Sequence, residues 1–333
     1  MSNKEAIKFQ DALAAASRFN GLVTRTPLLE SRLLNEKAGR RVLVKAECLQ
    51  QTGSFKFRGG MSAVTQLSAE QRRSGVVAYS SGNHAQGVAL AAKLAQVEAV
   101  IVMPSDAPKI KLTNTRRYGA EIVLYDRAGG ESREQVGAQI VNERGLYLIK
   151  PYDNAQVIAG QATCGIEIAE QADEAGVREA DVLVCCGGGG LTSGIAISLE
   201  AKAPDMTVRP VEPEHYDDVI RSQLSGKREF VSTNEPSICD AIVTPAPGEL
   251  TFPIIQRLCG SGIRVTDEEA IKAIGIIMKY LKIIAEPGGA VALAAALFHP
   301  EEVNSDTVIC TVSGGNADDE MIKQALTACY NTE

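Results

Sequence analysis

The chain alternates apolar, strand-like segments with helix-like segments along its whole length. The strand-like segments lie at residues 41–47, 76–79, 99–103, 121–125, 146–149, 182–186, 208–212 and 308–312. Helix-like stretches separate them, including an alanine-rich one from 85 to 94 and another from 161 to 172. Such alternation is typical of α/β proteins with largely parallel sheets, and it restricts the fold more than any other feature of the sequence.

The order of these segments predicts a small α/β unit inserted into a larger one. Four strand-like segments follow one another within residues 73–151, a block with the size of a small subdomain. We therefore expect a large domain of residues 1–72 and 152–333 and a small domain of residues 73–151. Clefts between such units are favoured ligand sites.

Charge and cysteine content narrow the function classes. The formal net charge is −7 without a basic block, which argues against a nucleic-acid or anionic-membrane partner. No apolar run reaches the length of a membrane span, and the N-terminal segment 1–6 does not have the pattern of a signal peptide. The eight cysteines form no C-x-x-C pair, as expected for reduced thiols in a cytoplasmic protein.

One lysine stands out because two phenylalanines flank it. Lys56 lies between Phe55 and Phe57 in a stretch that is otherwise small and flexible. Apolar rings disfavour the ammonium form and so favour the free amine, which attacks carbonyl carbons. The alternative is an ordinary solvated surface lysine.

A polar turn, Ser80-Ser81-Gly82-Asn83-His84, lies between a predicted strand and a predicted helix. Loops at the carboxyl ends of parallel strands bind ligands in α/β proteins. The backbone N–H groups of this turn, at the positive end of the helix, are suited to a carboxylate. The alternative is a plain helix cap with an exposed or hydrogen-bonded His84.

Four successive glycines, Gly187, Gly188, Gly189 and Gly190, also follow a strand and precede a helix. Their backbone can approach a phosphate closely and direct several N–H groups at it. A dinucleotide site is the chief alternative, but the G-x-G-x-x-G spacing fails because Thr192 and Ser193 stand where a glycine is required. A cradle for a monophosphate fits better.

Two further turns follow strands. Ser313-Gly314-Gly315-Asn316 is a weak signal by itself. The segment 212–218 places four carboxylates in seven positions, which allows either a solvated surface or a hard-cation site. In the cation site, Glu212 and Asp218 bind the ion with a backbone carbonyl between them.

Taken together, these motifs resemble the fold-type II pyridoxal-phosphate enzymes, in particular the serine/threonine dehydratase and serine racemase group. The matching segments are 54–59, 80–84, 157–161, 187–190 and 313–316, and they occur in the order and spacing of that group. The resemblance implies two open, mostly parallel twisted sheets flanked by helices, as in tryptophan synthase β, with the cofactor in the large domain. It also implies a homodimer.

The resemblance implies a role for each matching residue. Lys56 would hold pyridoxal phosphate as a Schiff base and later remove the α-proton. Asn83 would bind the cofactor 3′-hydroxyl, Ser313 its pyridine nitrogen, and the glycines 187–190 its phosphate. Ser80, Asn83 and His84 match the turn that binds the substrate carboxylate, and Ser81 matches the residue that acts on the opposite face in racemases. A neutral partner for the ring nitrogen weakens the electron sink and suits elimination.

The implied reaction is dehydration of a β-hydroxy amino acid, namely serine, threonine or 3-hydroxyaspartate, to a 2-oxo acid and ammonia. Tyr152 resembles the aromatic residue of dehydratases, which favours elimination over the alternative, an amino-acid racemase. A non-catalytic amino-acid sensor is a further alternative from a different class.

Two more matches concern specificity and metal binding. Arg133 matches a position near the substrate mouth and would bind a second carboxylate, unless it is an exposed helix arginine. Glu212, the carbonyl of Tyr216, and Asp218 match a divalent-cation site, for Mg²⁺ or Mn²⁺, of the racemase branch.

Overall fold

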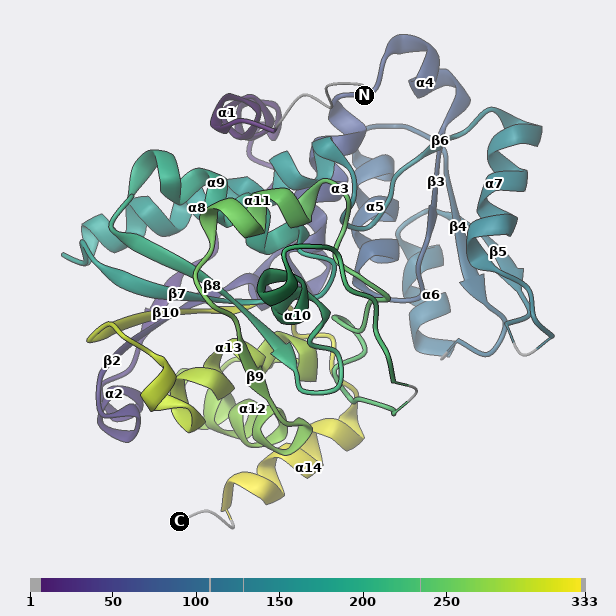
Figure 1. The fold of residues 1–333 in the computed structure, drawn as a ribbon. Helices are drawn as coiled ribbons and strands as arrows, with labels where there is room; N and C mark the ends of the chain where they lie inside the picture. The colour runs from purple at the N-terminus through teal and green to yellow at the C-terminus, as the bar shows by residue number, and fades with distance from the viewer. Residues whose placement is uncertain (1–6, 108, 128, 234, 331–333) are drawn as a thin grey trace.

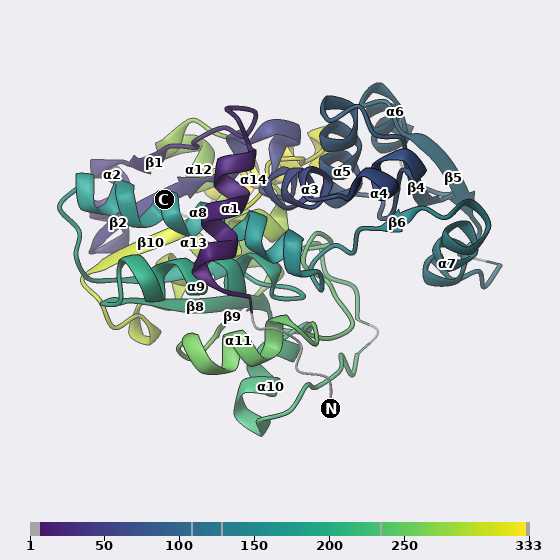
Figure 2. The same cartoon turned by 90° about the horizontal axis from the view of Figure 1, so that it is seen from above.

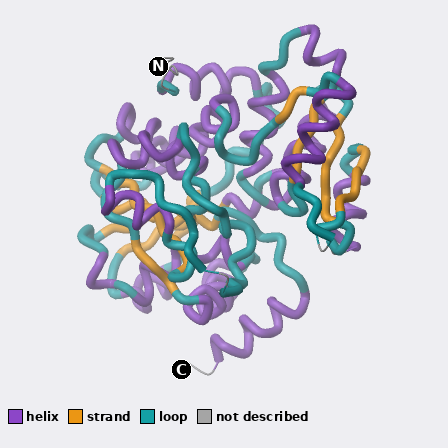
Figure 3. The backbone as a smooth tube through the Cα atoms, turned by 45° about the vertical axis from the view of Figure 1, so that its right-hand side comes forward, coloured by secondary structure: helices purple, strands orange, loops and turns teal. Residues whose placement is uncertain are grey.

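The computed structural model describes residues 7–107, 109–127, 129–233 and 235–330, and their strands form two sheets (Figure 1). The six-stranded sheet has the order β1 (Leu28–Glu30), β2 (Arg41–Ala46), β10 (Thr307–Val312), β7 (Ala180–Cys185), β8 (Met206–Pro213), β9 (Ile263–Val265). The four-stranded sheet has the order β5 (Glu121–Tyr125), β4 (Ala99–Pro104), β3 (Val76–Tyr79), β6 (Tyr147–Leu148). Figure 3 shows the strands gathered in these two groups.

All recorded strand pairs are parallel except β1 with β2. The predicted α/β class with two mostly parallel sheets is therefore confirmed. The strands between residues 73 and 151 form a sheet of their own, and the proposed domain boundaries beside them stay a prediction. Among the described residues we found no helix whose length and apolar character would let it cross a bilayer.

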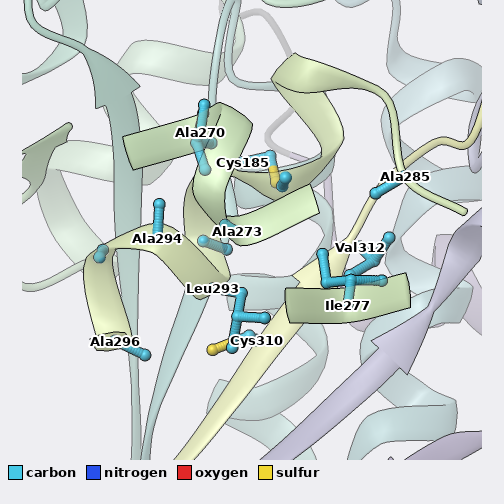
Figure 4. Packing of buried hydrophobic residues seen from close by; sticks show 14 of the residues in the cluster. Cys185, Ala270, Ala273, Ile277, Ala285, Leu293, Ala294, Ala296, Cys310 and Val312 are labelled. Atoms are coloured by element: carbon cyan, nitrogen blue, oxygen red, sulfur yellow. The ribbon is translucent and has the colours of Figure 1, made fainter. Parts of the chain in front are cut away.

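Helices cover both faces of the six-stranded sheet. On one face lie α8 (Ala155–Glu174) and α9 (Gly190–Lys202), with α1 (Phe9–Arg18) across α8 (Figure 2). On the other face lie α12 (Asp267–Leu281) and α13 (Pro287–Phe298), whose side chains form the largest apolar cluster with β10 and β7. Figure 4 shows Leu293 and Ile277 of these helices near Cys310 and Val312. The remaining helices of this part are α2 (Arg32–Ala38), α10 (Asp218–Ser225), α11 (Thr251–Leu258) and α14 (Asp319–Tyr330).

Local sequence signals explain where helix α12 begins and why helix α13 is buried. A capping box of Thr266 and Glu269 opens α12: the Glu269 N–H donates to Thr266 Oγ1 at 3.2 Å, and the Thr266 N–H donates to Glu269 Oε2 at 2.8 Å. Helix α13 is apolar on all sides, and residues 287–296 are buried accordingly.

The four-stranded sheet also has helices on both faces. Successive residues of β3 point to opposite faces, so Val76 and Ala78 join the cluster with α5 (Asn83–Leu94). Val77 and Tyr79 face α7 (Arg133–Arg144) on the other side. The helices α4 (Ala69–Ser74) and α6 (Lys109–Arg117) complete this part of the chain (Figure 1).

Helix α3 (Lys56–Thr65) joins the two parts because glycines let it pack closely on α5 and α8. A Cβ atom on Gly87 of α5 would lie 2.9 Å from the Lys56 carbonyl carbon. A Cβ atom on Gly160 of α8 would lie 2.5 Å from the Arg58 carbonyl oxygen. The first residue of α3 is thereby held where both sheets end.

Candidate active site

Lys56 is the first residue of α3 and is only partly exposed. Its Nζ donates to the Pro151 carbonyl at 3.0 Å and lies 5.0 Å from the centre of the Phe55 ring. Burial lowers the pKa of Lys56 to about 8, although the Glu286 carboxylate acts to raise it. Phe57 instead packs into the core, so one of the two flanking rings lies beside the amine.

The segment before Lys56 pairs with the Ser313–Asn316 turn, more than 250 residues away in sequence. Ser54 forms a β-bridge with Gly314, and the Phe55 N–H donates to the Ser313 carbonyl at 3.1 Å. A Cβ atom on Gly53, where φ is +73°, would lie 2.6 Å from Asn316 Oδ1. Two separate motifs of the sequence thus form one continuous surface beside the amine.

The Ser80–His84 turn reaches this surface through Asn83, the first residue of α5. Asn83 Nδ2 donates to Glu286 Oε1 at 2.5 Å, and Asn83 Oδ1 accepts from Asn316 Nδ2 at 2.7 Å. Ser80 Oγ accepts from the Gly82 N–H at 3.2 Å. The N–H groups that open α5 have no partner within the helix, which suits an anion.

The side chain of His84 points into the protein, and its predicted place in the carboxylate turn stays a prediction that its backbone N–H can serve. It is buried, and its Nε2 donates to the Ile149 carbonyl at 2.9 Å. Burial, and then the charge of Lys56, lower the pKa of His84 to about 3. The ring is therefore neutral with Nδ1 as an acceptor, and only the backbone N–H of His84 can donate to a carboxylate.

The four glycines form a loop between β7 and α9, on the same sheet edge as Ser313. A Cβ atom on Gly188 would lie 2.3 Å from Cδ2 of Tyr152, and one on Gly187 would lie 2.6 Å from the Ile242 carbonyl oxygen. Gly189 has a φ of +86°, and α9 begins at Gly190. A close backbone approach and a helix N-terminus therefore coincide, as a phosphate requires.

Tyr152 connects this loop to the amine. Its ring lies against Gly188, and the preceding residue, Pro151, accepts the hydrogen bond from Lys56. The Tyr152 hydroxyl donates to the Ala246 carbonyl at 3.5 Å. The amine and the phosphate cradle are thus neighbours across one dipeptide.

Four of the buried polar atoms that lack a hydrogen-bond partner in the described part of the chain belong to segments that adjoin the amine or the glycine loop. They are Ser54 Oγ, His84 Nδ1, Thr192 Oγ1 and Thr244 Oγ1. Each unsatisfied group is unfavourable by about 1–3 kcal/mol, and such groups are rare in folded proteins. Together with the cradle and the amine, they fit a ligand that carries a phosphate, a carbonyl carbon and further polar atoms, as pyridoxal phosphate does.

Glu286 belongs to the site, although sequence reasoning missed it. It is buried directly before α13, and burial raises its pKa to about 7 against the hydrogen bond from Asn83, which lowers it. Its sequence context, Glu-Pro-Gly-Gly before an alanine-rich stretch, resembles an ordinary helix start. No local signal shows that this carboxylate would be buried near a lysine.

Arg133 is both an exposed helix residue and a neighbour of the site. It is the first residue of α7, its side chain is 44% exposed, and its Nε donates to Glu134 Oε1 at 2.7 Å. The guanidinium lies 5.6 Å from the centre of the Tyr79 ring, and Tyr79 immediately precedes the Ser80–His84 turn.

The predicted cation ligands lie at the end of β8 and the start of α10. Glu212 is fully buried and accepts from the Val219 and Ile220 N–H groups at 3.0 and 2.8 Å. Asp218 is buried as well, and its Oδ2 has no partner among the residues described. Burial, and then the Asp218 carboxylate, raise the pKa of Glu212, and burial raises that of Asp218 to about 7. Two buried carboxylates with a free oxygen fit a divalent cation.

A lysine of lowered pKa beside a glycine-built phosphate cradle characterises enzymes that hold a phosphorylated aldehyde on an amine. Comparison with known proteins identifies the family. A family model described as "Pyridoxal-phosphate dependent enzyme" matches residues 19–314, and the chain belongs to this family.

Individual relatives give a closer comparison. An L-threo-3-hydroxyaspartate ammonia-lyase from a Pseudomonas species is 42% identical over 318 residues, covering 96% of this chain and 98% of the relative. A serine racemase from Schizosaccharomyces pombe is 38% identical, covering 94% and 95%. The crystal structure of a threonine deaminase from T.th. has a TM-score of 0.87 at 42% identity, covering 93% and 99%. The predicted family and the predicted class, a pyridoxal-phosphate-dependent lyase, are confirmed.

Proposed function

We propose that this enzyme removes water from 3-hydroxyaspartate, preferring the L-threo isomer, and releases a 2-oxo acid and ammonia. The observation that carries the proposal is the place of Arg133, whose guanidinium lies over Tyr79, next to the turn that is suited to a carboxylate. A second positive site beside the first favours a substrate with two carboxylates over serine or threonine. The name of the Pseudomonas relative supports the same substrate.

The residues of the chain divide the work of binding. The N–H groups that open α5, with Ser80 beside them, bind the α-carboxylate of the substrate, and Arg133 binds the second carboxylate. Gly187–Gly190 and the positive end of α9 hold the cofactor phosphate. Ser313 would hydrogen-bond the ring nitrogen of the cofactor, and Asn83 its hydroxyl.

Proton transfer falls to Lys56. Bound pyridoxal phosphate supplies an electron sink for the α-carbon of the substrate. The Lys56 amine removes the α-proton, and its pKa of about 8 leaves a useful fraction of free base near neutral pH. The neutral Ser313 keeps the sink weak, so departure of the β-hydroxyl as water is favoured over transfer of the amino group.

Racemisation is a second candidate activity. Ser81 lies in the turn that opens α5 and is half-buried, as expected for a hydroxyl that donates a proton from the face opposite Lys56. The similarity to serine racemases supports it. Exchange of Ser81 for alanine then removes racemisation and retains dehydration, as followed by chiral chromatography and 2-oxo acid release.

Glu212, the Tyr216 carbonyl and Asp218 form a site for Mg²⁺ or Mn²⁺ in this proposal. The unpaired oxygen of buried Asp218 supports it. A chelator then lowers the melting temperature of the wild type and leaves that of Asp218→Asn unchanged. An equal effect of the chelator on both proteins would contradict the site.

Three further features extend the proposal. A homodimer follows the resemblance to the family, and sedimentation of the holoenzyme tests it. The eight free cysteines are compatible with a cytoplasmic enzyme. Residues 73–151 act as the small domain that carries the carboxylate turn and Arg133, opposite the cofactor-binding residues 1–72 and 152–333.

A turnover panel tests the proposed function. The substrates are L- and D-serine, L- and D-threonine and the stereoisomers of 3-hydroxyaspartate, each with Mg²⁺ and with a chelator. We expect the highest kcat/KM for L-threo-3-hydroxyaspartate. In Arg133→Met this value falls by about 10- to 100-fold, since a charge-assisted pair is worth about 1.5–3 kcal/mol. Faster turnover of serine or threonine by the wild type, with no effect of Arg133→Met, would refute the assignment.

A further inference from the structure

We propose that Tyr79 is a positioning residue that sets the selectivity of this site for dicarboxylic β-hydroxy amino acids. The inference rests on the proposed function and deepens it. Tyr79 is the last residue of β3, and its ring projects toward α7 together with Val77. The Tyr79 ring lies beneath the first turn of α7, which begins at Arg133.

The ring touches two residues of α7 that lie one helical turn apart. Its centre is 5.6 Å from Cζ of Arg133, and its Cδ1 is 3.1 Å from the position of a Cβ atom on Gly137. Residues at i and i+4 share one helix face, so a single ring can contact both. Gly137 is buried inside the helix, where glycine is less favourable than alanine, and its missing side chain leaves the room that the ring occupies.

Arg133 is poorly placed by helix electrostatics alone. A cation at the first helical position lies at the positive end of the helix dipole, which is unfavourable. Its ring contact and its hydrogen bond to Glu134 keep it there. The ring contact and the engaged Nε restrict the motion of the guanidinium. We found no partner for its two terminal amino groups in the part of the chain described here, so they form a free fork for a carboxylate.

The position of Tyr79 in the chain links the two carboxylate sites. Tyr79 is followed directly by Ser80, where the turn for the α-carboxylate begins. The strand that carries the ring therefore also carries the turn, and the ring contact places Arg133 of α7 relative to that turn. A ligand with two carboxylates meets both sites, whereas a ligand with one carboxylate meets only the turn.

The test compares Tyr79→Leu with Tyr79→Phe, which retains the ring, and with Tyr147→Leu. Tyr147 is a matched control because it is a half-buried tyrosine on the adjacent strand β6 that packs in the cluster on the α5 face. In Tyr79→Leu we expect KM for L-threo-3-hydroxyaspartate to rise about tenfold, with kcat nearly constant and KM for L-serine nearly unchanged. Both control variants retain the wild-type values. Gly137→Ala favours the helix but crowds the Tyr79 ring. In this variant we expect KM for L-threo-3-hydroxyaspartate to rise about threefold and KM for L-serine to stay nearly unchanged.

A binding measurement separates this inference from the proposed function. Titration calorimetry of the holoenzyme with malate and with lactate compares a dicarboxylate with a monocarboxylate without turnover. We expect Tyr79→Leu to weaken malate binding about tenfold and to leave lactate binding unchanged. If malate weakens in this way while 3-hydroxyaspartate is a poor substrate of the wild type, the proposed function is wrong and the role of Tyr79 stands.

The opposite result is equally decisive. If Arg133→Met weakens malate and impairs 3-hydroxyaspartate turnover while Tyr79→Leu does neither, Tyr79 does not position the arginine and the proposed function stands. An equal loss for both ligands in Tyr79→Leu would assign the ring a general structural role and overturn the inference.

Discussion

The two sides of helix α3 differ in how fully their polar groups are satisfied. Lys56 and Arg58 are two residues apart, so they point about 200° apart around the helix axis. Arg58 pairs with Glu47 and Glu167, each at 2.7 Å, and these carboxylates also accept hydrogen bonds from Thr26 and Lys45. Among the described residues, Lys56 makes one hydrogen bond, to the Pro151 carbonyl, and Ser54 and His84 of the adjoining segments carry unsatisfied polar atoms.

The Arg58 side is a closed network of buried charges. Lys45 donates to Glu167 at 2.6 Å, to the Thr26 carbonyl at 2.7 Å and to Gln171 at 2.9 Å. Although burial alone would raise it, the pKa of Glu47 is lowered because Arg58 is its partner. Buried polar groups that hydrogen-bond one another stabilise the fold, whereas buried polar groups without a partner are suited to bind a ligand. We therefore expect the ligand on the Lys56 side of the helix.

The largest effect is expected on the open side. Lys56→Ala removes the tether and the base together, so turnover falls at least about 10³-fold. The fold remains, because the Lys56 side chain makes a single hydrogen bond to the part of the chain that the structure describes. Release of 2-oxo acid measures the loss of turnover, and thermal unfolding of the apoenzyme shows that the variant remains folded. Loss of folding in this variant would abolish the distinction between the two sides.

On the Arg58 side of the helix, a substitution should lower the unfolding free energy. Arg58→Met leaves the buried carboxylate of Glu47 and the partly buried carboxylate of Glu167 without their shared partner, which costs about 3–5 kcal/mol of unfolding free energy. Arg41→Met is the matched control, since Arg41 forms a two-pronged pair with Glu30 at the surface. That change is worth about 1 kcal/mol or less. Urea unfolding of the two apoenzymes measures both losses of unfolding free energy. Equal losses would show that the Arg58 network stabilises the protein no more than a surface ion pair does.

A pH profile sharpens the description of the open side. Only the free amine of Lys56 attacks an aldehyde, so the rate at which the apoenzyme binds pyridoxal phosphate rises with pH and levels off above about 8. Glu286→Gln removes a negative charge that raises the pKa of Lys56, and the midpoint of the profile therefore moves to lower pH. Stopped-flow absorbance measures the rate. A midpoint near the ordinary lysine value, or a shift to higher pH, would contradict the electrostatic account.

The smallest effect concerns one unsatisfied hydroxyl. Thr244→Val removes a buried Oγ1 that lacks a partner among the described residues, so the apoenzyme should unfold no more easily than the wild type. Cofactor affinity should fall by about three- to tenfold, because the ligand loses one hydrogen bond of about 1 kcal/mol. Fluorescence titration measures the cofactor affinity, and thermal unfolding measures the stability of the apoenzyme. A less stable apoenzyme would mean that Thr244 has a structural partner.

Much of the fold could be predicted from the sequence, because strand and helix periodicity and turn glycines are local signals. The predicted strand at 308–312 and the helix at 161–172 lie within one residue of, or inside, observed elements. The loop 187–190 is also predictable from local sequence, since four residues without side chains let the backbone approach a ligand closely.

Other features depend on tertiary packing and could not be predicted. Flanking phenylalanines suggest an enclosed amine, but a helical turn rotates Phe57 away into the core. The neutral state of His84 and the buried carboxylate of Glu286 both arise from segments far away in sequence. Arg133 over Tyr79 joins a helix start to a strand end more than fifty residues earlier.

The most direct test is to locate the cofactor on the chain. The purified protein is incubated with pyridoxal phosphate, reduced with borohydride, digested and analysed by mass spectrometry. We predict one phosphopyridoxyl group, on Lys56, in the wild type and in Thr244→Val. A label on a different lysine, or no label on a protein that remains folded, would contradict the claim that the unsatisfied side of α3 is the cofactor site.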